Sequence, residues 1–273
     1  MAHTRVTRCV VWSVLMVCLL MDAPAWAETV IVRPSNAAQL GWVVVSQTGM
    51  AVRVSDGSSR PSEAVAEFVA GYESPPAGSG SLHLFVGSGE QDPLPKVYVG
   101  TNRYVGVRLD RITQFKVWVC PRWWEYGGAQ PVTLELAISK DGNLRLCTFY
   151  PWGSDPTGYY GRRLWREVDL MSPGGSWEIT NMDSTNRKGD WRWLVRRYPE
   201  AAVTAPPAKD WPAGTLSGAG VNVKIGAGQA VEANHGAWWR ESSGCNAYVD
   251  KLTIGYLDTT GKEVVTTYDF EAE

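Results

Sequence analysis

Apolar and polar residues alternate with a period of two along much of the chain. Leu82, Leu84 and Val86 fall on one side of an extended backbone, and the same pattern recurs in residues 114–119 and 133–138. Such alternation predicts β-strands with one face in a core. Further strands are expected in residues 143–148, 163–170, 220–225, 248–256 and 262–270. Many short strands separated by Gly- and Pro-containing turns predict an all-β sandwich or barrel.

Local signals place the turns and one helix among these strands. The Asp-Gly pair at residues 141–142 and the Asp-Thr-Thr-Gly run at 258–261 are typical of hairpins. Asp190 is a suitable N-cap, and apolar residues follow it at helical spacing until Pro199. We expect a short helix here that covers an open end of the sandwich.

The first 27 residues have the pattern of a secretory signal peptide. Basic residues precede an apolar run at 9–21, which is too short to span a bilayer comfortably. The Ala-Trp-Ala sequence at 25–27 is a cleavage pattern, so we expect a mature chain of residues 28–273. An uncleaved N-terminal anchor is the alternative, and the two small residues favour cleavage over it.

The remaining chain is expected to be one domain that is secreted or periplasmic. No later apolar stretch has membrane length, so no membrane span is expected in the mature chain. The Pro-rich stretch at 205–214 is interpreted as a surface loop because strand-like sequence resumes after it. Lysine and arginine number 26 against 28 acidic residues, which gives no basis for nucleic acid as a partner.

Three of the five cysteines, Cys120, Cys147 and Cys245, lie after the signal segment. An odd number leaves at least one thiol free or in an intermolecular bond. Strand parity places Cys120 and Cys147 on outward faces, two strands apart. That separation is about 9–10 Å, which exceeds disulfide reach. We therefore expect no bond between these two residues.

Several short motifs occur in a recognisable order along the mature chain. They are TVIVRPSN at 29–36, PPAGSGSLHL at 75–84, FYPW at 149–152, SWE at 176–178, RYPEA at 197–201, AYVDKLTIG at 247–255 and TYDFE at 267–271. Together they resemble a family of secreted bacterial jelly-roll proteins of unassigned function, whose members often carry an exosortase sorting tail that does not occur here. The resemblance implies an antiparallel jelly-roll β-sandwich and export, and it supplies no catalytic residues. A looser similarity links YVDKL at 248–252 to jelly-roll carbohydrate-binding modules.

Tryptophan is unusually abundant, with 14 residues in the chain. Sugars present flat C–H faces that stack on aromatic rings, and their hydroxyls need nearby polar groups. Segments rich in both predict ligand-binding residues, namely Trp123, Trp124, Tyr126, Trp152, Trp238 and Trp239. Large aromatic residues also pack the cores and ends of sandwiches. Core packing is the favoured role for Trp118, Trp165 and Trp177, and both roles stay open for the adjacent tryptophan pairs.

Candidate catalytic groups are incomplete. Glu167 and Asp169 share a strand face, as in the E-x-D-x-(x)-E strand of a retaining glycosidase family, but the third acid is missing. An ordinary solvated strand face is the favoured interpretation. The two histidines of the mature chain, His83 and His235, are distant in sequence and lack a nucleophile elbow, which argues against a Ser-His-Asp hydrolase.

Asp250 is a carboxylate at a position with inward parity. It shares the alternation of Tyr248 and Leu252, so we expect it to be buried and to need a partner. Two alternatives stay open. Backbone N–H groups could bond to it, which we favour, or it could bind a structural calcium ion with help from Glu67 or Asp269.

These observations predict an exported, non-enzymatic jelly-roll β-sandwich with one short covering helix that binds extracellular or envelope glycan. A polysaccharide is the expected partner, and no cofactor is expected beyond the structural calcium alternative at Asp250. Two other functions stay open. One is a glycoside hydrolase or polysaccharide lyase on a similar sandwich, and the other is a self-associating surface protein.

Overall fold

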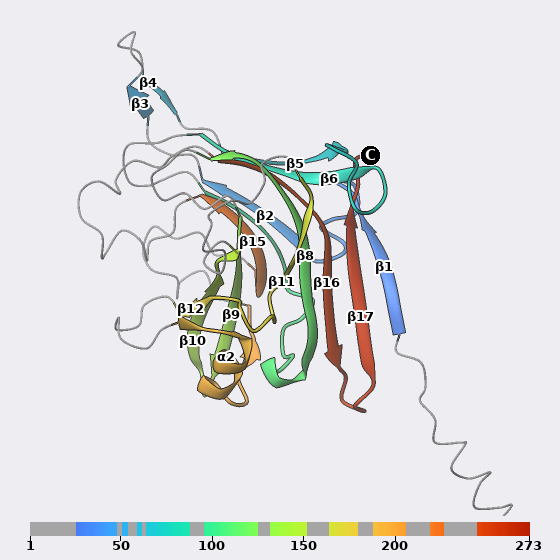
Figure 1. The fold of residues 1–273 in the computed structure, drawn as a ribbon, viewed down its shortest axis with the longest axis vertical. Coiled ribbons are helices and arrows are strands. Elements are labelled where there is room, and N and C mark those ends of the chain that lie inside the picture. The colour runs from blue at the N-terminus through green and yellow to red at the C-terminus, as the bar shows by residue number, and fades with distance from the viewer. Residues whose placement is uncertain are drawn as a thin grey trace, which may run out of the picture.

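A computed structural model describes residues 26–47, 51–53, 59–61, 64–87, 96–124, 132–151, 164–179, 188–205, 219–226 and 245–273. Most of these residues belong to two sheets, sheet A and sheet B, packed as a sandwich (Figure 1). Sheet A contains β1 (Trp26–Val32), β5 (Ala64–Ala70), β6 (Gly80–Val86), β8 (Ile112–Trp124), β11 (Arg166–Asp169), β16 (Cys245–Leu257) and β17 (Glu263–Phe270). Sheet B contains β2 (Trp42–Gln47), β7 (Lys96–Thr101), β9 (Thr133–Lys140), β10 (Asn143–Phe149), β12 (Trp177–Ile179), β13 (Lys188–Gly189), β14 (Ala202–Val203) and β15 (Val221–Gly226). A separate ribbon pairs β3 (Ala51–Arg53) with β4 (Ser59–Pro61).

Strand β16 is the centre of sheet A. One of its edges pairs with β8 over most of its length. Its other edge pairs first with β6 and then with β17. Strands β5 and β1 lie outside β6 and β17, and β11 lies outside β8. The β1–β17 pair is parallel, and every other strand pair in the described residues is antiparallel. The predicted all-β sandwich with one short helix is confirmed.

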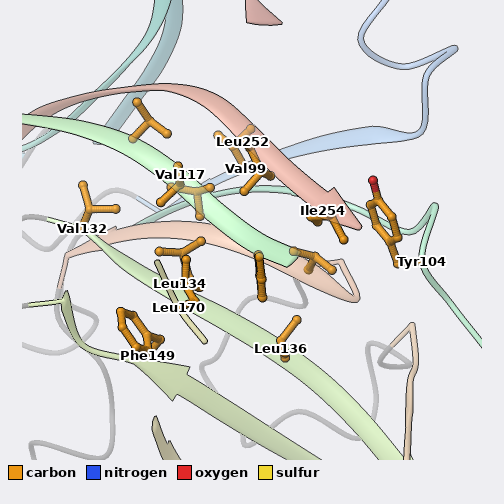
Figure 2. Packing of buried hydrophobic residues seen from close by; sticks show 14 of the residues in the cluster. Val99, Tyr104, Val117, Val132, Leu134, Leu136, Phe149, Leu170, Leu252 and Ile254 are labelled. Carbon is orange, nitrogen blue, oxygen red and sulfur yellow. The ribbon is translucent and has the colours of Figure 1, made fainter. Parts of the chain in front are cut away.

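The core lies between the inner faces of the two sheets, where the alternation places it. Leu82, Leu84 and Val86 are buried in it, as predicted. Side chains of both sheets converge there, among them Val99 and Leu134 from sheet B and Val117 and Leu252 from sheet A (Figure 2). Burial of these apolar surfaces is the main favourable contribution to folding.

Helix α2 (Trp191–Arg197) begins where its predicted cap stands. The Asp190 carboxylate accepts a hydrogen bond from the backbone N–H of Trp193 at 2.7 Å. Trp191 and Leu194 face the core, so the helix buries one side against the sandwich. A 3₁₀ turn, η1 (Leu109–Arg111), leads into β8. Within the described ranges, no helix has the length and apolar character needed to cross a membrane.

Two of the tryptophans and one cysteine lie elsewhere than expected. Of the tryptophans assigned to the core, Trp177 is there, whereas Trp118 and Trp165 are not part of it. Trp118 lies on the outer face of β8 because its neighbours in the strand, at positions 117 and 119, point inward. Cys147 was expected to face outward, but it lies in the core because it pairs across the ladder with Leu136. Cys120 and Cys147 are both free thiols, but they lie in different sheets and not two strands apart in one sheet.

Replacement of Trp177 by alanine is expected to lower the free energy of unfolding by about 3–5 kcal/mol. The side chain is fully buried against Phe149 and Trp191, and its Nε1–H donates to the carbonyl oxygen of Leu170 at 2.9 Å. Urea unfolding measures the change. Leu164→Ala is the control, since Leu164 is 59% exposed and its loss should cost less than about 0.5 kcal/mol. Equal effects of the two substitutions would contradict this core.

Candidate functional site

The predicted aromatic ligand residues lie at or beyond the edges of the described chain. Strand β8 ends with Trp123 and Trp124, whose backbones pair with residues 246 and 245 of β16. The positions of four others, Tyr126, Trp152, Trp238 and Trp239, lie outside the described residues. That these six side chains bind a ligand stays a prediction.

The described strands nevertheless show that these aromatic segments are attached at one end of the sandwich. Cys245, the first residue of β16, lies between Val86 at the end of β6 and Trp124 at the end of β8. The short segment 125–131 then leads from sheet A to the first strand residues of β9 in sheet B. Segments 152–163 and 227–244 also join the two sheets, and they leave from strand ends on this same side (Figure 1). We call this the attachment end.

An aromatic stack lies on the outer face of sheet A close to the attachment end. The rings of Tyr72 and Tyr248 are parallel within 7° with centroids 4.6 Å apart. His83 stacks on the same Tyr248 ring at 4.7 Å. The Arg122 guanidinium lies 4.3 Å from the centre of the Tyr72 ring, which is a cation–π distance. We call these four residues the aromatic stack.

Polar groups surround the histidine end of the aromatic stack. Nδ1 of His83 lies 2.8 Å from the Glu67 carboxylate, and its Nε2 lies 3.1 Å from the side-chain oxygen of Asn246. Glu67 is 53% exposed, so this end of the aromatic stack is open to solvent. Asn246 pairs through its backbone with Trp123, which places the aromatic stack beside the predicted ligand segment. Flat rings next to hydrogen-bonding groups are the combination that sugars require.

A β-bulge explains why Tyr248 belongs to this outer face. Tyr248, Asp250 and Leu252 were expected to share one inward face, but the register of β16 shifts between Asp250 and Thr253. Lys251 has a positive φ of 49° at that point. The extra residue reverses the alternation. Leu252 therefore enters the core, whereas Tyr248 and Asp250 point to the opposite face.

Asp250 is fully buried on that face, beneath the loop that precedes β6. One carboxylate oxygen accepts the backbone N–H of Phe270 at 3.1 Å, and the other accepts that of Ala77 at 3.2 Å. Burial raises the pKa of Asp250 to about 7, and the N–H donors oppose this rise only in part. The nearby Asp269 carboxylate raises the pKa further.

A second carboxylate holds the same loop. Glu271 accepts hydrogen bonds from the backbone N–H and the hydroxyl of Ser79 at 2.6 and 3.0 Å. Gly78 has a φ of 50°, and any side chain there would collide with the Glu271 carboxylate. No group of three or more His, Cys, Asp or Glu side chains in the described ranges is arranged to hold a metal ion. The contacts of Asp250 are those of the hydrogen-bonded alternative, and the calcium alternative stays a prediction.

Glu167 and Asp169, the partial glycosidase motif, lie on edge strand β11 of sheet A. Both are exposed. Glu167 accepts a hydrogen bond from the Lys116 ammonium group at 3.1 Å, and Asp169 accepts one from the backbone N–H of Met171 at 2.9 Å. This is the geometry of a solvated strand face.

The outer face of sheet B holds a group of polar residues that sequence reasoning missed. Lys224 and Glu135 form a buried ion pair with a distance of 2.7 Å between Nζ and Oε1. The Lys224 ammonium lies 5.4 Å from the centre of the Tyr98 ring. Lys224 pairs with Tyr98 of β7 on one side and with Thr133 of β9 on the other. The alternation in β9 indicated polar residues opposite the core leucines. Only the structure shows that they are buried.

Comparison with family models, with curated proteins and with solved structures finds no match for this chain. The resemblance to a secreted jelly-roll family therefore rests on the sequence motifs.

The stability of the protein is expected to fall as the pH rises from about 4 to 8 because of Asp250. Its pKa is about 7 in the folded chain against an ordinary value of 3.8, so the folded state binds the proton more tightly than the unfolded state. This contribution is fully present below the ordinary pKa and is lost as the pH rises through 7. Thermal unfolding between pH 4 and 8 measures it.

Asp250→Asn is the comparison for this pH series, because the amide removes the titrating group and keeps the side-chain shape. The difference in melting temperature between wild type and variant should then change with pH across the same window. A constant difference from pH 4 to 8 would show that Asp250 does not carry the raised pKa.

Proposed function

We propose that this protein binds a glycan at the attachment end of the sandwich and does so without catalysis. The observation that carries the proposal is the aromatic stack, which lies beside the strand ends that lead into the tryptophan-rich segments. The rings of Tyr72 and His83 are partly exposed, and Glu67, Asn246 and Arg122 provide charged and amide groups beside them. Protein–sugar recognition needs both kinds of group in one place.

The positions of the charged residues support binding over hydrolysis. Retaining and inverting glycosidases use two carboxyl groups on opposite sides of the scissile bond, about 5–10 Å apart. Glu167 and Asp169 instead lie side by side on one exposed strand, and Glu167 is paired with a lysine. The carboxylates of Asp250 and Glu271 are engaged in holding the loop before β6.

We further propose that the protein acts outside the cytoplasm after removal of residues 1–27. The support is the sequence pattern of a signal peptide, together with the structure at the cleavage position. Trp26, which begins β1, is 69% exposed, so its loss removes little packing. The remaining residues of β1 keep their pairing with β17 from Glu28 to Val32.

Binding of the mature protein to a panel of insoluble and soluble polysaccharides tests the proposal. Trp123→Ala, Trp238→Ala and Tyr72→Ala should each weaken binding about threefold to tenfold, the value of one aromatic stacking contact. Tyr256→Ala is the matched control, since Tyr256 lies at the other end of β16, against Tyr104. It should leave binding unchanged.

Two results would contradict the proposal. One is a wild-type protein that binds none of the polysaccharides. The other is binding that is equally reduced by Tyr256→Ala, which would indicate a general loss of structure. Self-association would instead appear as a molecular mass that rises with protein concentration in light scattering.

A further inference from the structure

We propose that a surface cavity between the η1 turn and the β16–β17 hairpin binds a small organic acid, whose carboxylate is held by the guanidinium group of Arg111. The cavity has a volume of about 400 Å³ and is lined by residues from two segments, 106–111 and 256–259. Clefts of this size are typical of small-molecule sites. The cavity lies at the opposite end of β16 from the attachment end, so this inference goes beyond the proposed glycan site and does not depend on it.

Backbone hydrogen bonds hold both walls of the cavity in place. In the first wall, the N–H of Gly106 donates to the carbonyl oxygen of Val203 at 2.8 Å, and the N–H of Val203 donates to that of Val107 at 2.9 Å. In the second wall, the N–H of Asp258 donates to the carbonyl oxygen of Lys262 at 2.8 Å. A ligand that enters a cavity with fixed walls has little ordering of the protein to offset.

Arg111 lines the cavity, is partly exposed, and has no carboxylate partner. Its Nη1–H donates to the carbonyl oxygen of Asp258 at 2.9 Å, which joins the two walls and fixes the position of the guanidinium group. No Asp or Glu carboxylate in the described part of the chain lies within 4.0 Å of this group. A guanidinium group has five N–H donors in a planar fork that matches the two oxygens of a carboxylate.

The other charged groups of the lining already have partners. Arg108 donates to both oxygens of the Asp110 carboxylate, at 2.9 and 2.6 Å. The Asp258 carboxylate accepts hydrogen bonds from the turn that follows it. Glu200 lies 4.0 Å from Arg108, but it is 71% exposed and does not line the cavity. Arg111 is therefore the charged group of the lining that remains to bind a ligand, and its charge selects an anion.

The apolar part of the lining indicates an organic acid and not an inorganic anion. Val107 and Leu257 line the cavity from opposite walls, and both are only partly buried. Contact with an aliphatic or aromatic group would remove this surface from water, which favours binding. A bare phosphate or sulfate ion offers no apolar surface for such a contact.

Isothermal titration calorimetry of the wild-type protein with benzoate, benzamide and inorganic phosphate tests the inference. Benzoate should bind. Benzamide keeps the ring but lacks the charge, so it should bind at least about tenfold more weakly. Phosphate lacks the ring and should also bind more weakly than benzoate. Absence of benzoate binding, equal binding of benzoate and benzamide, or tighter binding of phosphate would each overturn the inference.

Variants of the arginine then locate the site. Arg111→Gln should weaken benzoate binding about tenfold to hundredfold. Arg111→Lys keeps the charge but not the planar fork and should weaken it about threefold to tenfold. Arg145→Gln is the matched control, because Arg145 is also partly exposed and donates to a backbone carbonyl oxygen at 2.9 Å, but it does not line the cavity.

Two results with these variants would contradict the site. One is unchanged benzoate binding by Arg111→Gln, and the other is an equal loss in Arg145→Gln. The comparison of benzoate with benzamide uses the wild type, so it decides the ligand class even if Arg111→Gln does not fold. None of these measurements involves a glycan, and their failure would leave the proposed function unchanged.

Discussion

The exchange of partners along one edge of β16 is the constraint on which the rest of this structure depends. The first half of that edge pairs with β6 and the second half with β17, so the sheet forks between Val249 and Leu252. A fork leaves backbone groups without a ladder partner, and buried N–H groups must be bonded. Asp250 stands at this fork and accepts the N–H of Phe270 from one branch and that of Ala77 from the loop leading into the other. One carboxylate thus joins the two branches of sheet A.

The bulge at the same point decides which side chains reach the outer face. Without the extra residue at Lys251, Tyr248 would share a face with Leu252 and enter the core. With it, Tyr248 becomes the middle ring of the aromatic stack, and the second half of β16 still supplies the core. The outer face of sheet A and its inner packing are therefore set by a single backbone irregularity.

Alternation in the sequence was sufficient to predict the core residues of strands such as β6 and β9, because one buried face imposes a period of two. The N-cap at Asp190 could also be predicted, because it depends on the local sequence alone. The bulge could not be predicted, because Lys251 is neither glycine nor proline and its sequence gives no sign of its positive φ. The face of Cys147 depends on its pairing with Leu136, and the burial of Glu135 depends on the tertiary surroundings of sheet B. Neither of these is a property of the local sequence. The sequence thus indicated the polar residues of the outer faces but could not indicate which of them are buried together.

The parallel pairing of β1 with β17 joins the first strand of the fold to its last. Sheet A therefore cannot be completed until nearly the whole chain is present, since β16 and β17 both lie in the final residues. Contacts between such distant parts of a sequence make folding slow, because the entropy of a long loop is lost before the contacts form. A chain that is still emerging from a ribosome would lack β16, the central strand of sheet A, and β17, the strand that pairs with β1. Completion of sheet A is therefore a late step, which follows the synthesis of β16 and β17.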